Sequence, residues 1–332
     1  MVSPTVDRVM ADARAASFTR RSIKNDAKEA GLRLALSMLD LTTLEGKDSA
    51  EKVRSLCRKA VAPDVNDSSL PSVAAVCVYP AMVSTAAAAL EGTGVHIASV
   101  ATGFPSGQFP LEVRLEDTRR AILAGADEID MVIARGTFLA GGHDEMQREI
   151  AEVKRVCVTT VVGGDASGGT KASARRADVP GRSALPADGS SSNRRAHLKV
   201  ILETGELETY DLVRLASDLS IQAGLTDGDF IKTSTGKVQP AATMGVTLVM
   251  LEAVRDHYLR TGVRIGVKPA GGIRTAKQAL HYLVMVKETV GDDWLTPDFF
   301  RFGASTLTND ILMQWARLKR GCYMAAYDFA EA

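Results

Sequence analysis

Eight short apolar segments, each followed by an amphipathic stretch, are the feature that most constrains the fold of this chain. The segments are LDLTTL (39–44), VAAVCVYP (73–80), HIASVATGF (96–104), EIDMVIA (128–134), LKVILETG (198–205), DFIKTSTG (229–236), RIGVKPAGG (264–272) and FRFGAS (300–305). Helical patterns follow them, for example at 111–126, 145–157 and 241–262. Eight strand-then-helix units in 332 residues predict an α/β fold, the (β/α)8 or TIM barrel. A doubly wound open sheet is the alternative.

The sequence outside these units predicts a simple domain organisation. Residues 18–39 have the pattern of an extra N-terminal helix. We expect residues 1–17 to be a flexible N-terminus, residues 18–320 to form a single barrel domain, and residues 321–332 to form a C-terminal tail.

One segment, residues 163–196, does not fit the barrel pattern. Its only large apolar side chains are Val179 and Leu185. Such a composition cannot bury enough surface to offset the entropy of ordering the chain. We therefore predict a disordered, low-complexity insertion. It falls between the fourth helix and the fifth strand, on the face opposite the βα loops that carry chemistry in barrels.

Overall composition excludes several classes of protein. Lys+Arg and Asp+Glu both number 40, so nothing favours a nucleic-acid or membrane-surface partner. The four cysteines form no CxxC pair, which argues against a zinc site or a disulfide framework and suits a reducing compartment. No apolar run approaches the length of a membrane span, and the first residues lack the apolar core of a secretory signal. We expect a cytoplasmic protein.

Ionisable residues occupy the inward-facing positions of four successive strands. Alternate residues of a strand face opposite sides, and in these strands the apolar residues share one parity. The other parity carries Asp130, Lys199, Lys232 and Lys268. A purely structural barrel core uses bulky apolar residues at such positions. A single inward lysine is compatible with a structural ion pair, but four ionisable residues together indicate a functional site.

The pairing of Lys232 with Lys268 predicts a specific chemistry. A lysine has a pKa of about 10.4, and only its neutral amine condenses with a carbonyl to form a Schiff base. A second ammonium about 4 Å away disfavours the cation by about 4 kcal/mol at an effective dielectric near 20, and partial desolvation can supply the rest. We therefore predict that Lys232 is kept neutral. Asp130 suits proton transfer beside the imine, which is compatible with a role as ion-pair partner.

Glycine-rich turns follow the last three strands. They are GKV (236–238), AGGIRT (270–275) and RFGAST (301–306). Glycine lets backbone N–H groups approach an anion closely, and the loops after strands seven and eight form the usual phosphate site of barrels. Together these turns favour a phosphorylated substrate.

Several strings of the sequence resemble one known family. LDLTTL, VCVYP, GADEIDMV, LKVILETGEL, DFIKTSTGK, VKPAGGIRT and RFGAST occur in the order typical of deoxyribose-phosphate aldolases, and the resemblance covers residues 39–158 and 197–310. These are class I aldolases, (β/α)8 barrels that need no metal or other cofactor. The resemblance implies reversible cleavage of 2-deoxy-D-ribose 5-phosphate to D-glyceraldehyde 3-phosphate and acetaldehyde.

The resemblance also assigns roles to individual residues. It implies that Lys232 forms the Schiff base, that Lys268 tunes it and that Asp130 transfers protons. Asp40 and Lys199 match accessory polar positions in the substrate pocket. The residues that match the phosphate-binding turns are Gly236, Lys237, Gly271, Gly272, Gly303 and Ser305. Cys77 matches a cysteine near the pocket, although a buried small hydrophobe is the favoured interpretation of this residue.

Two regions depart from the family pattern, and two other functions stay open. The insertion has no counterpart, and the C-terminus lacks the usual tail, whose place Tyr323 or Tyr327 could take. The alternatives are another class I aldolase that acts on a ketose phosphate, and a catalytically inactive barrel that binds sugar phosphates. As partners we expect small-molecule sugar phosphates and aldehydes, and a homo-oligomer with a dimer favoured.

Overall fold

The computed structural model describes residues 3–160 and 195–329. The predicted insertion at 163–196 lies outside the described residues, apart from its last two positions.

Within the described residues, seven parallel strands form one sheet in which each strand pairs with the next along the chain. They are β1 (Asp40–Thr42), β2 (Ala75–Val78), β3 (His96–Val100), β4 (Glu128–Val132), β5 (His197–Ile201), β6 (Phe230–Lys232) and β7 (Gly266–Lys268). Chain order without a reversal is the order of a barrel. The doubly wound alternative is therefore wrong, because an open doubly wound sheet reverses its strand order.

The predicted eighth strand closes the ring through isolated bridges rather than as a full strand. Phe300 bridges to Val267 of β7, and Phe302 bridges to Leu39 just before β1. Phe302 donates its backbone N–H to the Met38 carbonyl, and its own carbonyl accepts from the Asp40 N–H, each at 2.9 Å. The predicted (β/α)8 barrel is thus confirmed.

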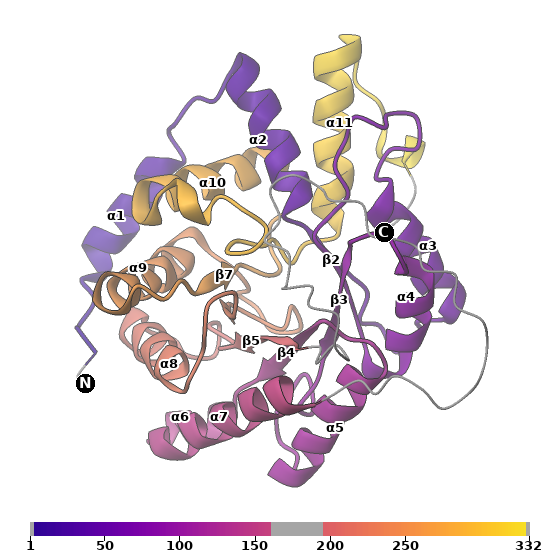
Figure 1. Ribbon diagram of the computed structural model, residues 1–332. Helices are drawn as coiled ribbons and strands as arrows, with labels where there is room; N and C mark the ends of the chain where they lie inside the picture. The colour runs from indigo at the N-terminus through magenta and orange to yellow at the C-terminus, as the bar shows by residue number, and fades with distance from the viewer. Residues whose placement is uncertain (1–2, 161–194, 330–332) are drawn as a thin grey trace, which may run out of the picture.

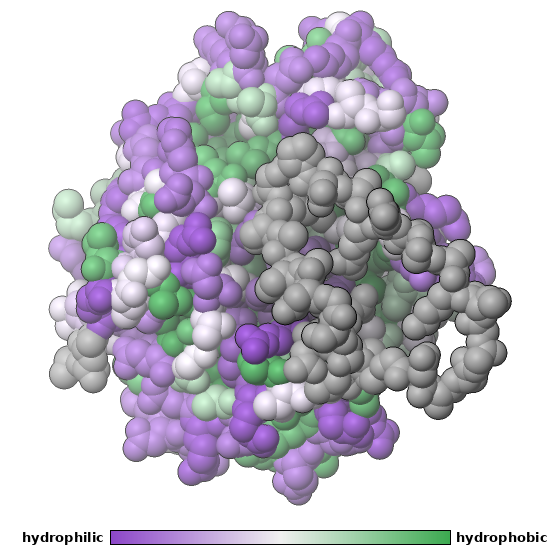
Figure 2. Space-filling model, viewed as in Figure 1, coloured by the Kyte–Doolittle hydropathy of each residue, from purple (hydrophilic) through white to green (hydrophobic). Residues whose placement is uncertain are grey.

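Helices surround the strands in an outer layer (Figure 1). They are α1 (Arg8–Phe18), α2 (Asn25–Ser37), α3 (Ala50–Val61), α4 (Val83–Leu90), α5 (Leu111–Leu123), α6 (Arg135–Leu139), α7 (His143–Thr159), α8 (Tyr210–Gln222), α9 (Met244–Thr261), α10 (Ala276–Val290) and α11 (Thr306–Arg320). On the face shown in Figure 2, the coloured surface is mainly hydrophilic. In the described part of the chain, no helix is long and apolar enough to cross a membrane.

Threonine side chains define where several of these helices begin. Thr209, Thr243 and Thr275 precede α8, α9 and α10, and each accepts a hydrogen bond from the backbone N–H three residues later. Such caps satisfy amide groups that have no partner inside the helix. They place the helix N-termini directly after the loops that leave β5, β6 and β7.

The N-terminal region holds one more helix than the sequence predicted. The expected helix at 18–39 is α2, which packs against α10 and α11. However, α1 covers much of the segment 1–17, for which we predicted flexibility. Ala15 and Phe18 of α1 are buried in the core, and Arg14 forms a 2.7 Å ion pair with Glu252 of α9. The small apolar residues of α1 were too weak a pattern to reveal this packing.

Two apolar clusters lie on the two sides of the strands. The main cluster joins the outward faces of the strands to the helices and includes Met131, Val200 and Val267. A small second cluster consists of Leu44, Cys77, Ala98 and Val100, with Tyr79 and Phe104 packed against it. This inner apolar cluster fills the barrel on the β2–β3 side, and charged residues fill much of the rest of the interior together with the ring of Phe230.

Candidate active site

The four inward ionisable residues lie side by side, as the strand alternation predicted. Asp130 pairs in register with Lys199 of the next strand, and Lys232 pairs in register with Lys268. Residues paired in this way project from the same face of the sheet. All four are at most 3% exposed.

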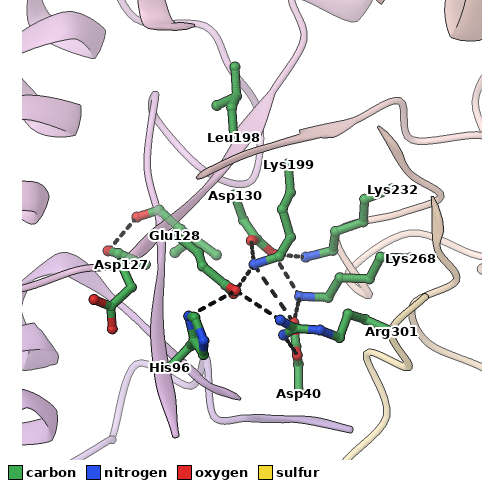
Figure 3. Close-up of polar contacts among 12 residues, drawn as sticks. Asp40, His96, Asp127, Glu128, Asp130, Leu198, Lys199, Lys232, Lys268 and Arg301 are labelled. Carbon is green, nitrogen blue, oxygen red and sulfur yellow. Dashed lines mark hydrogen bonds and ion pairs between the residues drawn. The ribbon is translucent and has the colours of Figure 1, made fainter. Parts of the chain in front are cut away.

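Asp130 is the centre of this group (Figure 3). Its Oδ2 atom lies 2.6 Å from Lys232 Nζ and 2.9 Å from Lys268 Nζ. Its Oδ1 atom lies 3.2 Å from Lys199 Nζ. One carboxylate therefore contacts all three inward lysines, and it connects Lys232 with the second lysine that was expected to tune it.

Three more charged residues complete the cluster, one of them predicted and two missed. Asp40, predicted as an accessory position, pairs with Lys268 at 2.5 Å and with Arg301 Nη1 at 2.7 Å. Arg301 Nη2 lies 3.0 Å from Glu128 Oε1, and Glu128 also contacts Lys199. The parity rule could have found both missed residues. Glu128 lies two positions before Asp130, and Arg301 lies between the outward-facing Phe300 and Phe302.

We call this set the charge cluster; its members are Asp40, Glu128, Asp130, Lys199, Lys232, Lys268 and Arg301. Burial is the largest influence on the pKa of Lys232 and lowers it, and the Lys268 charge lowers it further against the opposing effect of Asp130. Burial also acts to lower the pKa of Lys268, but Asp130 and Asp40 outweigh it and raise that pKa. From the sequence we attributed most of the lowering of the Lys232 pKa to the second ammonium. That ranking is wrong, since the intervening Asp130 offsets the Lys268 charge.

The carboxylates of the charge cluster remain ionised. Burial alone would raise the pKa of Asp130, but Lys199, Lys232 and Lys268 hold it well below its ordinary value. Lys199 has a raised pKa, because its carboxylate neighbours outweigh its burial. Among the three inward lysines, Lys232 is thus the one whose pKa is lowered.

Cys77 lies in the inner apolar cluster next to these charges. Burial, with the Asp130 charge, raises the pKa of its thiol to about 11. The thiol is neutral at physiological pH and packs as a small hydrophobe, which was the favoured interpretation.

The glycine-rich turns meet at the mouth of the barrel above β6, β7 and the closing segment. Gly236, Gly271 and Gly272 have φ values of +83°, +74° and +78°, a region that favours glycine. A Cβ on Gly271 would lie 3.5 Å from the Gly236 Cα, so the two turns touch. In the described residues, the backbone N–H groups of Gly236, Gly272 and Ala304 have no protein acceptor. These free donors are suited to an anion.

The remaining residues that were predicted to bind phosphate link these turns to the end of β1. Ser305 precedes α11, and its hydroxyl accepts from the Thr42 N–H at 2.7 Å and donates to the Thr42 carbonyl at 2.8 Å. Lys237 Nζ donates to the Leu44 carbonyl at 2.7 Å. A Cβ on Gly303 would lie 3.3 Å from Lys268 Cε, so this glycine brings the backbone close to the charge cluster. The N-terminus of α11 adds its amide groups at the same end of the barrel.

Other features lie apart from this site. Tyr323 and Tyr327 of the tail are exposed, and Tyr323 stacks with Arg317. A cavity of about 610 Å³ opens between α5 and the ends of β2 and β3, and no member of the charge cluster lines it. No group of three or more His, Cys, Asp or Glu side chains in residues 3–160 and 195–329 is arranged to hold a metal ion.

Comparison with known proteins identifies the family of this chain. Residues 34–161 match the model of the DeoC/LacD family aldolases. Deoxyribose-phosphate aldolase of Mus musculus is 42% identical over 320 residues, covering 93% of this chain and 88% of its own length. The Homo sapiens enzyme of the same name is 41% identical with the same coverage.

Solved structures show the same fold. One described as the unique tetrameric structure of deoxyribose phosphate aldolase from Aeropyrum pernix superposes with a TM-score of 0.58 at 22% identity, over 95% of this chain and 100% of that one. At this identity the likeness concerns the fold alone. On the strength of the mouse and human relatives, the chain belongs to the deoxyribose-phosphate aldolase family.

Proposed function

We propose that this chain interconverts 2-deoxy-D-ribose 5-phosphate with D-glyceraldehyde 3-phosphate and acetaldehyde through a Schiff base on Lys232. Family membership places it among the aldolases, which are carbon–carbon lyases. The observation that carries the role of Lys232 is its environment: it is a buried lysine with a lowered pKa beside two lysines whose pKa values are raised. A neutral amine is the form that attacks a carbonyl.

The proposed reaction begins when the Lys232 amine adds to C1 of the open-chain sugar and water is lost. The resulting iminium accepts electrons. Removal of the C3 hydroxyl proton forms the new carbonyl as the C2–C3 bond breaks. The electron pair of the C2–C3 bond moves toward the iminium and forms the enamine. Glyceraldehyde 3-phosphate leaves, C2 of the enamine takes up a proton, and water hydrolyses the iminium to acetaldehyde.

Asp130 is the group best placed to move these protons. Its carboxylate is ionised and lies 2.6 Å from Lys232 Nζ, so it can accept a proton directly or through water. Lys268 is the cation that disfavours charge on Lys232, while Asp40 and Lys199 hold Lys268 and Asp130 in place. These roles are supported by the contacts and by the family resemblance.

The phosphate is proposed to bind at the glycine turns. The residues involved are Gly236, Lys237, Gly271, Gly272, Gly303 and Ser305. The support is their meeting at one end of the barrel and the free amides of Gly236 and Gly272. A phosphate there would place the sugar chain between the turns and Lys232.

The proposal also covers the compartment, the domain organisation and the assembly of the protein. We propose a cytoplasmic enzyme of deoxyribonucleotide catabolism, one barrel domain over residues 18–320, and a homo-oligomer with a dimer favoured. Light scattering of the purified chain distinguishes a dimer from a tetramer, the assembly described for one relative.

Borohydride trapping with acetaldehyde tests the central claim. Reduction should leave a two-carbon adduct on Lys232, mapped by mass spectrometry of peptides. Lys154→Met is a matched control, because Lys154 is also a buried, ion-paired lysine, 2.6 Å from Asp229 and outside the charge cluster. This variant should be labelled like the wild type. An adduct found only on Lys199 or Lys268 would refute the assignment.

A further inference from the structure

Two members of the charge cluster have no part in the chemistry proposed above. Glu128 begins β4 and Arg301 lies in the closing segment, and both are at most 3% exposed. Their contacts reach Lys232 only through other residues. Glu128 acts by way of Lys199 and Asp130, and Arg301 by way of Asp40 and Lys268 (Figure 3). A role for either one must therefore be indirect.

The number of charges in the cluster suggests what that role is. The cluster holds three carboxylates and four basic groups, joined by a continuous set of ion pairs. A buried charge without a compensating partner is costly. With Lys232 uncharged, three cations balance three anions, whereas a charged Lys232 would leave one cation in excess. Arg301 is one of the three cations that stay charged near neutral pH, with Lys199 and Lys268.

We propose that Arg301 and Glu128 are positioning residues whose opposite, fixed charges bias, in opposite directions, whether Lys232 holds a proton. This inference rests on the proposed role of Lys232 as the Schiff-base residue. It assigns a function in the reaction to two side chains that do not touch the substrate.

The charged groups around this pair come from several strands of the barrel and from the closing segment. Arg301 faces Asp40 of β1 and Glu128 of β4, with Asp298 nearby on its own segment. Glu128 also faces Lys199 of β5, and His96 of β3 lies 3.5 Å away. Around Lys232 are Asp130, Lys268 and the Cys77 thiol. Ion pairing lowers the pKa values of the carboxylates Asp40, Glu128 and Asp130 and raises the pKa values of Lys199, Lys268 and Arg301, so these six groups keep their charges near neutral pH.

The two residues should therefore have opposite effects on the pH dependence of the reaction. A unit charge about 10 Å away at an effective dielectric near 20 moves a pKa by about one unit. Arg301→Met removes a positive charge, so Lys232 should hold its proton more tightly and the acid limb of kcat/KM should move up by about one pH unit. Glu128→Gln removes a negative charge and should move that limb down by a similar amount. The double variant should return close to the wild-type position.

Matched variants separate charge from packing. Arg301→Lys keeps the charge but not the forked geometry, so it should lower kcat without moving the limb. Arg114 and Glu149 form a buried ion pair between α5 and α7, outside the charge cluster. Arg114→Met and Glu149→Gln remove the same chemical groups there, and both should leave the limb where it is.

The decisive measurement is the pH dependence of borohydride trapping at Lys232 with acetaldehyde, alongside kcat/KM for deoxyribose phosphate. Three results would overturn the inference. The acid limb does not move in Arg301→Met or Glu128→Gln, it moves in the same direction in both variants, or it moves equally in Arg301→Lys and Arg301→Met. If one variant does not fold, the direction of the shift in the other decides. Wild-type labelling at a lysine other than Lys232 defeats the proposed function, whereas labelling at Lys232 with unmoved limbs defeats only this inference.

Discussion

The two halves of the barrel interior are filled in different ways. On the β2 and β3 side the inward residues are the small apolar side chains Cys77, Ala98 and Val100. From β4 through the closing segment to β1, the charge cluster occupies inward positions, with the ring of Phe230 beside Lys199 and Arg301. The border is sharp, since Val100 pairs in register with Asp130. The first half follows the packing rule for a barrel core, and the second half breaks it.

The charged half contributes less to the stability of the barrel than the apolar half and holds the proposed catalytic residues. Apolar filling stabilises a barrel by removing surface from water, whereas buried ion pairs contribute little net stability because each charge must first be desolvated. The charged half is maintained by mutual pairing, with Asp130 contacting three lysines. We therefore expect changes in the charged half to reduce activity, and also stability where they leave a buried charge without its partner, and changes in the apolar half to affect mainly stability.

The largest expected effect is that of Lys232→Met. This substitution removes the only group proposed to form the covalent intermediate, so turnover of deoxyribose phosphate should fall by a factor of at least about 10³. An assay that couples glyceraldehyde 3-phosphate release to a dehydrogenase measures it. Residual activity above a tenth of wild type would show that the charged half does not work through Lys232.

Lys268→Leu should have a smaller effect that depends on pH. Removing this cation lets Lys232 hold its proton more tightly, so the acid limb of the rate moves to higher pH. Activity should be lost by about 10²-fold at pH 7 and partly recovered as pH rises, because the neutral fraction of Lys232 increases. A loss that is equal at every pH would instead assign Lys268 to proton transfer or substrate binding.

Val100→Ala tests the apolar half directly beside the border. Deleting two buried methyl groups removes their transfer free energy and leaves a small cavity, so the free energy of unfolding should fall by about 2 kcal/mol. Urea denaturation measures this change, and kcat should remain within a few-fold of wild type. A variant that keeps full stability but loses turnover would contradict the expectation that the apolar half contributes mainly to stability.

Metal removal should have no effect. The iminium serves as the electron sink in the proposed reaction, so EDTA treatment followed by desalting should leave kcat unchanged. Loss of turnover that added Zn²⁺ restores would refute this prediction.

Much of this arrangement could be predicted from the sequence because strand alternation carries strong information. The alternation of apolar residues in four strands was enough to predict that Asp130, Lys199, Lys232 and Lys268 face inward. The same rule also predicts that Glu128 and Arg301 face inward, but we used it only for Asp130 on the fourth strand and not for the eighth strand, so both were missed. The pKa balance at Lys232 could not be predicted, because it depends on Asp130 lying between the two ammonium groups. Nor could α1, whose packing depends on a tertiary contact with α9.

The closing of the barrel by isolated bridges has a consequence for its motions. The segment from Phe300 to Phe302 joins its neighbours through isolated bridges, whereas β4 and β5 pair in register over five residues. Local opening should therefore occur most readily at this seam, where amide hydrogen exchange should be faster than in β4 and β5. Arg301 and Ser305 lie on the same seam, so one opening event would disturb the charge cluster and the phosphate turns together. Binding of a sugar phosphate should slow exchange at the seam more than elsewhere in the strands, which mass spectrometry of exchanged peptides can measure.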